Sequence, residues 1–327
     1  MLNARDNFLE TLHHGKPDAF VNEWEPFGFV FDPLMGVTLI AQPGKYVVDG
    51  WGTTIYMGED EPGAMPIVRD DNKAIPDITE WKKYIKSPDI KQKLDWTAAK
   101  EQAEAIHKEN KLTVSLMATG LFEQSHYLMG FEDTLMNFLL EPEAMHELVD
   151  AVAEYRFQYA KLLVDNLKPD VILSHDDWGS KRSLFMQPDT WREFFKDHYK
   201  RIYGYMKDHG VIVIHHADSF CEPIVEDMVD IGIDVWQGVL PENDIVKLQK
   251  QLDGRMTLMG GIDATIDRKD STEEEIRADV RRACSTYGPG GHYIPCMTYG
   301  LAGTIYPRTD EVIADEIDRY NKETYGV

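Results

Sequence analysis

Short apolar stretches of strand length alternate with longer amphipathic stretches along most of this chain, and this order constrains the fold more than any other feature. Runs rich in β-branched residues are typical of strands, and apolar residues that recur every three or four positions are typical of helices. The expected strands cover 19–24, 111–117, 170–175, 211–216, 233–238, 255–261 and 292–296. The expected helices cover 97–109, 141–167, 188–208, 222–231, 243–252 and 272–287.

This alternation predicts an α/β fold in which helices cover a parallel sheet. Seven or eight such units indicate a TIM (β/α)8 barrel, and we expect residues 1–327 to form a single domain. A doubly wound sheet is the alternative, although no GxGxxG follows any expected strand. Residues 25–96 are rich in Pro, Gly, Trp and acidic residues and fit neither pattern. We expect them to form an N-terminal insertion that acts as a lid over one barrel mouth.

Charge and composition limit the possible partners. The formal net charge of −23 would repel nucleic acid and an anionic membrane surface. The start, MLNARDNFLE, lacks the apolar core of a secretory signal, and the chain has no apolar run of about 18 residues. We therefore expect a cytoplasmic protein that binds neither nucleic acid nor a membrane. The three cysteines include no CxxC pair, so no disulfide framework is expected.

Ionisable residues gather where the expected strands end, which is where barrel enzymes carry their chemistry. The residues in question are Glu23, Glu25, Glu123, His175, Asp176, Asp177, His215, His216, Asp218, Asp263 and Cys296. Because side chains alternate along a strand, His215 and His216 should point to opposite faces, whereas His216 and Asp218 can share one.

Imidazole, carboxylate and thiolate together suit zinc. We therefore predict that His216, Asp218 and Cys296 bind the metal and leave a fourth position open. The same residues also fit a structural interpretation, with a buried histidine bonded to backbone, an aspartate at a helix N-cap and a small apolar cysteine. Residue types alone leave both interpretations open.

Longer motifs carry a family resemblance. They are the opening ARDNFLETLHHGKPDAFVNEWEP, then DGWGTTI, LSHDDWGSKRSLFMQPDTWREFF, VIVIHHADSF and LMGGIDA, and the closing CMTYGLAGTIYPRTDEVIADEI. In these motifs, which span almost the whole chain, the sequence resembles the uroporphyrinogen decarboxylase-like superfamily. The resemblance implies a TIM barrel. The superfamily contains true decarboxylases and zinc-dependent, corrinoid-linked methyltransferases.

The stretch after the first expected strand bears on the choice between these branches. True decarboxylases resemble one another in an arginine-rich RQAGR stretch that holds substrate carboxylates, whereas this chain reads EWEPFGFVF. Glu23 and Glu25 would repel a tetrapyrrole that carries many carboxylates, which disfavours uroporphyrinogen decarboxylation. The methyltransferase branch carries His-x-Cys and a later Cys as zinc ligands. His216, Asp218 and Cys296 stand at these positions, with aspartate in place of the first cysteine.

The aspartate bears on the substrate, because an oxygen-richer ligand set keeps zinc more Lewis acidic and better suited to an ether oxygen than to a thiol. The resemblance then implies an aryl methyl ether O-demethylase component of the veratrole or vanillate type. Such an enzyme moves the methyl group to the Co(I) corrinoid of a separate corrinoid protein. A phenolate, whose conjugate acid has a pKa of about 10, is a poor leaving group. We therefore predict His175, Asp176 and Asp177 as catalytic residues that supply a proton, with a nearby tyrosine as the alternative donor.

A flat aromatic substrate would be held by aromatic side chains at the mouth. The predicted substrate-binding residues are Glu23, Trp24, Glu25, Met117, Trp178, Trp236 and Tyr299. The alternative is that such aromatic and Met side chains fill the core.

Two further functions stay open. One is methyl transfer from a methylated corrinoid to a thiol of the coenzyme M type, which differs in the acceptor. The other is a non-catalytic barrel that binds a small aromatic molecule.

Overall fold

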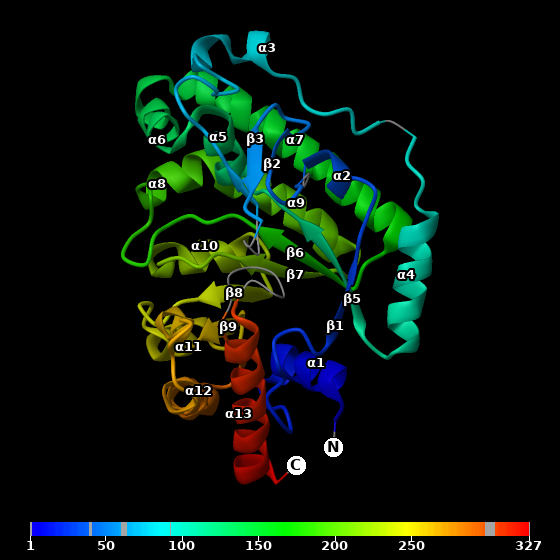
Figure 1. The fold of residues 1–327 in the computed structure, drawn as a ribbon, viewed down its shortest axis with the longest axis vertical. Coiled ribbons are helices and arrows are strands. Elements are labelled where there is room, and N and C mark those ends of the chain that lie inside the picture. Colours follow the sequence, from blue (N-terminus) through cyan, green and yellow to red (C-terminus); the bar gives the residue numbers. More distant parts are fainter. Residues whose placement is uncertain (1, 39–40, 60–63, 92, 298–304, 327) are drawn as a thin grey trace.

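The computed structural model describes residues 2–38, 41–59, 64–91, 93–297 and 305–326 (Figure 1). Within this part, seven parallel strands form one curled sheet in the order β1-β5-β6-β7-β8-β9-β10. Their bounds are β1 Phe27–Val30, β5 Leu112–Met117, β6 Val171–His175, β7 Ile212–His216, β8 Val235–Val239, β9 Thr257–Gly261 and β10 Tyr293–Cys296. The predicted TIM-type α/β architecture is confirmed, with seven strands in the described residues.

The first strand was placed wrongly by the sequence pattern. Residues 19–24 form no strand, and the strand that pairs with β5 is β1, at Phe27–Val30. Residues 22–25 instead border a cavity of 160 Å³ that is also lined by Pro295, Cys296 and Met297. The turn before β1 therefore lies beside the end of β10, so the two edge strands of the curled sheet approach each other.

Two apolar layers hold the sheet, one on each face. Leu173, Ile214 and Met259 belong to the inner layer, together with Phe8 of helix α1 (Ala4–His14). The ring of Phe8 packs edge-on against Phe27 at a centroid distance of 4.8 Å. Because Phe27 begins β1, helix α1 closes the amino end of the barrel and leaves the carboxyl ends of the strands for the candidate site.

The outer layer is formed by helices that follow the strands. They are α4 Thr97–Lys108, α5 Leu121–Met129, α6 Phe131–Leu140, α7 Pro142–Leu167, α8 Pro188–Trp191, α9 Asp197–Asp208, α10 Val225–Asp230, α11 Ile245–Leu252, α12 Glu273–Tyr287 and α13 Pro307–Tyr325. Local signals begin several of them: Thr272 and Glu275 form a capping box at α12, and Asp244 caps α11. Among the described helices, none is both long enough and apolar enough to cross a membrane.

The segment between β1 and α4 contains α2 (Met35–Thr38), α3 (Trp81–Tyr84) and an antiparallel sheet of β2 (Lys45–Val48), β3 (Thr54–Met57) and β4 (Ala64–Pro66). It contacts α5 through a hydrogen bond from the Ile75 N–H to the Leu128 carbonyl, at 2.9 Å. It contacts α7 through the rings of Trp51 and Tyr155. Figure 1 shows β2 and β3 beside these two helices. The range 25–96 thus includes barrel strand β1, and the later part of it is the candidate lid.

Candidate metal centre

A row of polar side chains stands at the carboxyl ends of neighbouring strands. In the sheet register His175 pairs with His216, and His216 pairs with Gln237. Cys296 ends β10 and belongs to the inner apolar layer. His175, His216 and Gln237 lie an even number of residues from inner-layer members of their own strands (Leu173, Ile214 and Val235), so they share the inner face. The sheet itself therefore brings these groups together.

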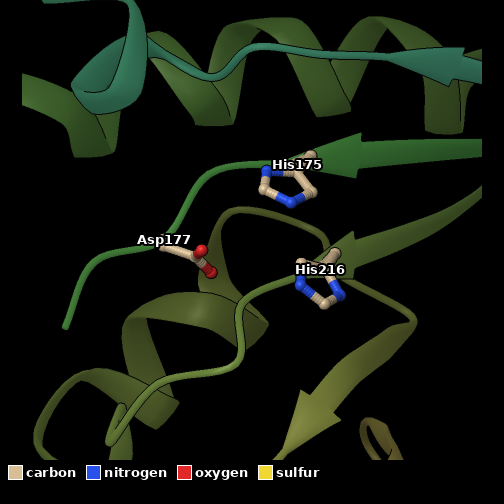
Figure 2. A group of neighbouring side chains, drawn as sticks. All are labelled: His175, Asp177 and His216. Carbon is tan, nitrogen blue, oxygen red and sulfur yellow. The ribbon is translucent and has the colours of Figure 1, made fainter. Parts of the chain in front are cut away.

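The side chains of His175, Asp177 and His216 converge on one point. One ligand atom from each of His175, Asp177 and His216 lies within 4.8 Å of the other two. Figure 2 shows the Asp177 carboxylate turned toward the two rings, which project from the ends of β6 and β7. The imidazole rings are stacked, with centroids 4.5 Å apart and an angle of 22° between their planes. Two nitrogens and one oxygen are thus presented to a common position.

His175 is oriented by a carboxylate from a different element. Its Nδ1 lies 2.9 Å from Oε2 of Glu123, in the first turn of α5. The Glu123 side chain is 7% exposed and the His175 side chain 25% exposed. Burial alone would lower the pKa of His175, but the charge and hydrogen bond of Glu123, with Asp177 and Asp176, raise it to about 10. Because Nδ1 faces Glu123, Nε2 is the nitrogen left for a ligand, and it must release its proton when a metal binds.

His216 is oriented in the same manner by an amide. Its Nδ1 lies 3.1 Å from Oε1 of Gln237, and Nε2 of Gln237 donates to Oε1 of Glu23 at 2.9 Å. Burial, together with the positive charge on His175, lowers the pKa of His216 well below its usual value. A neutral imidazole is the form that binds a metal.

Asp177 and Asp218 form a repelling pair beside the histidines. The backbone N–H of Asp218 donates to Oδ1 of Asp177 at 3.0 Å, which holds the Asp177 carboxylate in place. Burial and the charges of Glu123 and Asp218 raise the pKa of Asp177 well above its usual value. Burial and Glu123 raise the pKa of Asp218 to about 6, against the lowering effect of His175 and Lys181. A divalent cation would relieve this repulsion and favour both ionised forms.

The donor set fits a zinc ion. Zinc bonds to His and Asp are about 2.0–2.2 Å long, so two ligand atoms of one ion are at most about 4.4 Å apart. The ligand atoms of His175, Asp177 and His216 lie within 4.8 Å of one another, so a shift of a few tenths of an ångström would bring them inside this limit, and two imidazoles with one carboxylate form a known catalytic zinc set. Of the predicted ligands, His216 belongs to this group. Asp218 and Cys296 lie outside it, and their binding of a metal stays a prediction.

Asp176 holds the neighbouring structure together. It is fully buried and accepts hydrogen bonds from the backbone N–H groups of Phe122 and Glu123, from Trp178 Nε1 and from the Tyr199 hydroxyl, at 2.5–3.1 Å. A Cβ on Gly120 would lie 2.1 Å from the Asp176 Cβ, so only glycine fits there. This carboxylate therefore serves as the N-terminal cap of α5 and places Glu123 against His175.

His215 faces away from the metal group, as the strand alternation predicted. Its Nδ1 lies 2.7 Å from the Tyr203 hydroxyl of α9, and its ring stacks on Trp178 with centroids 4.1 Å apart. Burial lowers the pKa of His215 to about 3, so the ring is neutral. It is a core residue between the sheet and the helices.

The predicted substrate-binding residues fall into two groups. Met117, Trp178 and Trp236 are at most 2% exposed and belong to the outer apolar layer, where Trp236 Nε1 donates to the Ala217 carbonyl. Glu23 and Trp24 are half-buried beside Cys296, whereas Glu25 is exposed. Tyr299 lies outside the described residues.

Gln237 was not predicted as a site residue, and Glu123 was expected among the ionisable residues after the strands but was given no role. Gln237 could have been found from strand parity, because β8 continues the register of His216. Glu123 lies one turn into a helix, so its contact with His175 depends on how α5 is placed.

Comparison with known proteins identifies the family of the chain. A family model described as Uroporphyrinogen decarboxylase (URO-D) matches residues 46–320, which is most of the chain. The chain belongs to the URO-D family. The predicted superfamily is thereby confirmed, while the branch within it is not decided by this match.

Two curated relatives share about a quarter of their residues with this URO-D family member over the matched regions. The uroporphyrinogen decarboxylase of Chlorobium phaeobacteroides is 26% identical over 152 residues, covering 45% of this chain and 40% of the relative. That of Chlorobium limicola is 26% identical over 197 residues, covering 55% and 52%. The chain thus spans about half the length of the curated relatives it matches.

A solved structure described as a methyltransferase from Methanosarcina mazei is similar in fold. The TM-score is 0.62 at 18% sequence identity, and the match covers 88% of this chain and 82% of the other. At this identity the likeness shows a shared fold.

Proposed function

We propose that this URO-D family member is a zinc-dependent methyltransferase that demethylates an aryl methyl ether. In the proposed reaction the methyl carbon–oxygen bond breaks and its electron pair stays on oxygen, giving a phenolate. Co(I) on a separate corrinoid protein supplies the electron pair for the new carbon–cobalt bond, which leaves methyl-Co(III). No further oxidant or reductant is needed for this step.

The convergence of His175, Asp177 and His216 is the observation that carries the proposal. Both histidines have Nδ1 bonded to an oxygen, so both Nε2 atoms can face the same point as Asp177. When bound there, zinc would supply a Lewis acid for the charge that develops on the ether oxygen. The second carboxylate, Asp218, has a pKa of about 6 and stands beside this point. It can hold or release a proton near neutral pH.

The charge around the turn before β1 supports methyl transfer over decarboxylation of a polycarboxylate. Glu23 is linked to the site by a hydrogen bond from Gln237 Nε2, and no arginine occurs in residues 21–30. A substrate rich in carboxylates would be repelled there, whereas a neutral ether would not. The ring of Trp24 packs against Phe29 with centroids 5.2 Å apart, and both are half-buried. Such a pair offers a surface for another aromatic ring.

The test is to mix the zinc-loaded protein with a reduced corrinoid protein and a panel of methoxyarenes, and to follow the Co(I) absorbance. We expect loss of Co(I) and formation of equal amounts of methyl-Co(III) and a phenol. The Asp177→Asn variant should lose this activity, and Glu132→Gln, at an exposed position on α6, should keep it. Rapid methylation of a thiol from methylcobalamin, with no ether consumed, would favour the thiol-transferring alternative instead.

A further inference from the structure

The hydrogen-bond chain from Glu23 through Gln237 to His216 has a direction that its chemistry imposes. An ionised carboxylate offers only acceptors, so the Gln237 group that faces Glu23 must be the NH2. The Nε2 atom of Gln237 is indeed the donor, at 2.9 Å from Glu23 Oε1. The amide oxygen of Gln237 is therefore left to face His216, at 3.1 Å from Nδ1.

This orientation determines where the proton of His216 resides. A carbonyl oxygen cannot donate, so the Nδ1 atom of His216 must carry the hydrogen for this contact to be a hydrogen bond. A neutral imidazole has one N–H, so Nε2 then holds the lone pair. His216 is 1% exposed and Gln237 is fully buried, so water does not compete for these groups.

We propose that Glu23 and Gln237 are positioning residues that keep the neutral His216 ring in the tautomer whose Nε2 can bind the metal. The proposal rests on the metal centre of the proposed function, but it concerns the metal-free protein. Glu23 acts on His216 indirectly. It orients the Gln237 amide, and the amide oxygen then requires that Nδ1 of His216 carry the proton. The Glu123 carboxylate acts directly on His175 from the other side of the site.

The carboxylate and the amide of this hydrogen-bond chain can be exchanged between positions 23 and 237. In Glu23→Gln, residue 23 can donate as well as accept, so the Gln237 amide is free to turn over and both tautomers of His216 should form. In Glu23→Gln/Gln237→Glu, the carboxylate stands at position 237 and can only accept, so Nδ1 of His216 must again carry the hydrogen. The exchanged pair keeps the net charge of the wild type.

The primary measurement is the ¹⁵N NMR spectrum of the metal-free protein labelled at histidine nitrogens, with the His216 signals assigned by their loss in His216→Asn. We expect a single His216 tautomer protonated at Nδ1 in the wild type, a mixture in Glu23→Gln, and the wild-type pattern in the exchanged pair. Glu132→Gln, the same chemical change at an exposed glutamate of α6 outside the site, should leave the spectrum unchanged.

The second measurement is zinc affinity by competition with a chromophoric chelator. Loss of an outer hydrogen bond to a metal-binding histidine costs about 10- to 100-fold in affinity, which we expect for Glu23→Gln. The exchanged pair should recover most of this loss, whereas a loss caused by the Glu23–Cys296 hydrogen bond would persist in it. A wild-type His216 protonated at Nε2, or an exchanged pair that fails to restore the tautomer, would overturn the proposal. Neither result depends on whether the protein transfers methyl groups.

Discussion

Oε2 of Glu123 lies 2.9 Å from Nδ1 of His175, and the two residues come from different parts of the barrel. Glu123 is in the first turn of α5, which Asp176 caps, and His175 ends β6. A carboxylate on Nδ1 orients the ring and makes Nε2 a stronger donor to a metal.

Replacing this carboxylate should therefore weaken metal binding. For Glu123→Gln we expect zinc affinity to fall by about 10- to 100-fold, measured by chelator competition. The matched control is Glu132→Gln, an exposed glutamate on the adjacent α6, which should bind zinc as the wild type does. Equal affinities for the two variants would show that Glu123 does not support the metal centre.

The neighbouring aspartates should behave in opposite ways when they are made neutral. Asp176→Ala leaves the buried N–H groups of Phe122 and Glu123 without an acceptor, so the free energy of unfolding should fall by about 3 kcal/mol or more. Asp177→Asn removes a carboxylate whose pKa is raised by burial and by neighbouring charges, so the free energy of unfolding of the metal-free protein should rise at neutral pH.

Urea unfolding of the metal-free variants measures both changes, and zinc affinity separates their causes. Asp177→Asn should bind zinc poorly despite its stability. If Asp177→Asn were destabilised as much as Asp176→Ala, the assignment of one aspartate to the metal and the other to the α5 cap would be incorrect.

Several features of the site could be predicted from the sequence because they depend only on the alternation of side chains along a strand. Alternation predicted that His215 and His216 face opposite sides, and the structure confirms it. The same parity could have placed Trp236 on the helix side, since Gln237 shares the His216 face. Residues 19–24 misled because an apolar run next to a helix was taken for the first strand, whereas pairing with β5 occurs at Phe27–Val30.

Other features depend on loops, where side chains do not alternate regularly and the sequence does not predict their direction. Asp177 and Asp218 each follow a strand-ending histidine by two residues, so the spacing does not distinguish them as metal ligands. The loop after β6 turns the Asp177 carboxylate to the histidines, and the Asp218 N–H holds it there. Long-range contacts such as Glu123 with His175 likewise require the placement of α5.

The stability of the protein should fall at acidic pH because His215 is buried in its neutral form. Burial holds its folded pKa at about 3, against an ordinary value of 6.5 in the unfolded chain. Between these values the unfolded chain binds one more proton than the folded protein, so stability is lost as the pH falls from about 6.5 to 3. The contribution is on the order of 5 kcal/mol.

Unfolding by urea at a series of pH values measures this loss. His215→Gln should lower stability at neutral pH but show a shallower decline below pH 6.5 than the wild type. His13→Gln, at an exposed position, should retain the wild-type slope. Identical slopes for His215→Gln and the wild type would contradict the assignment of a neutral, buried ring.

Anomalous X-ray diffraction at the zinc edge, on crystals grown with zinc, tests the metal centre most directly. We predict one strong peak per chain, about 2.0–2.2 Å from the Nε2 atoms of His175 and His216 and from a carboxylate oxygen of Asp177. A peak bonded instead to Asp218 and Cys296 with His216 would restore the ligand set expected from sequence. The absence of any peak at the ends of β6 and β7 would contradict a metal-dependent reaction at this site.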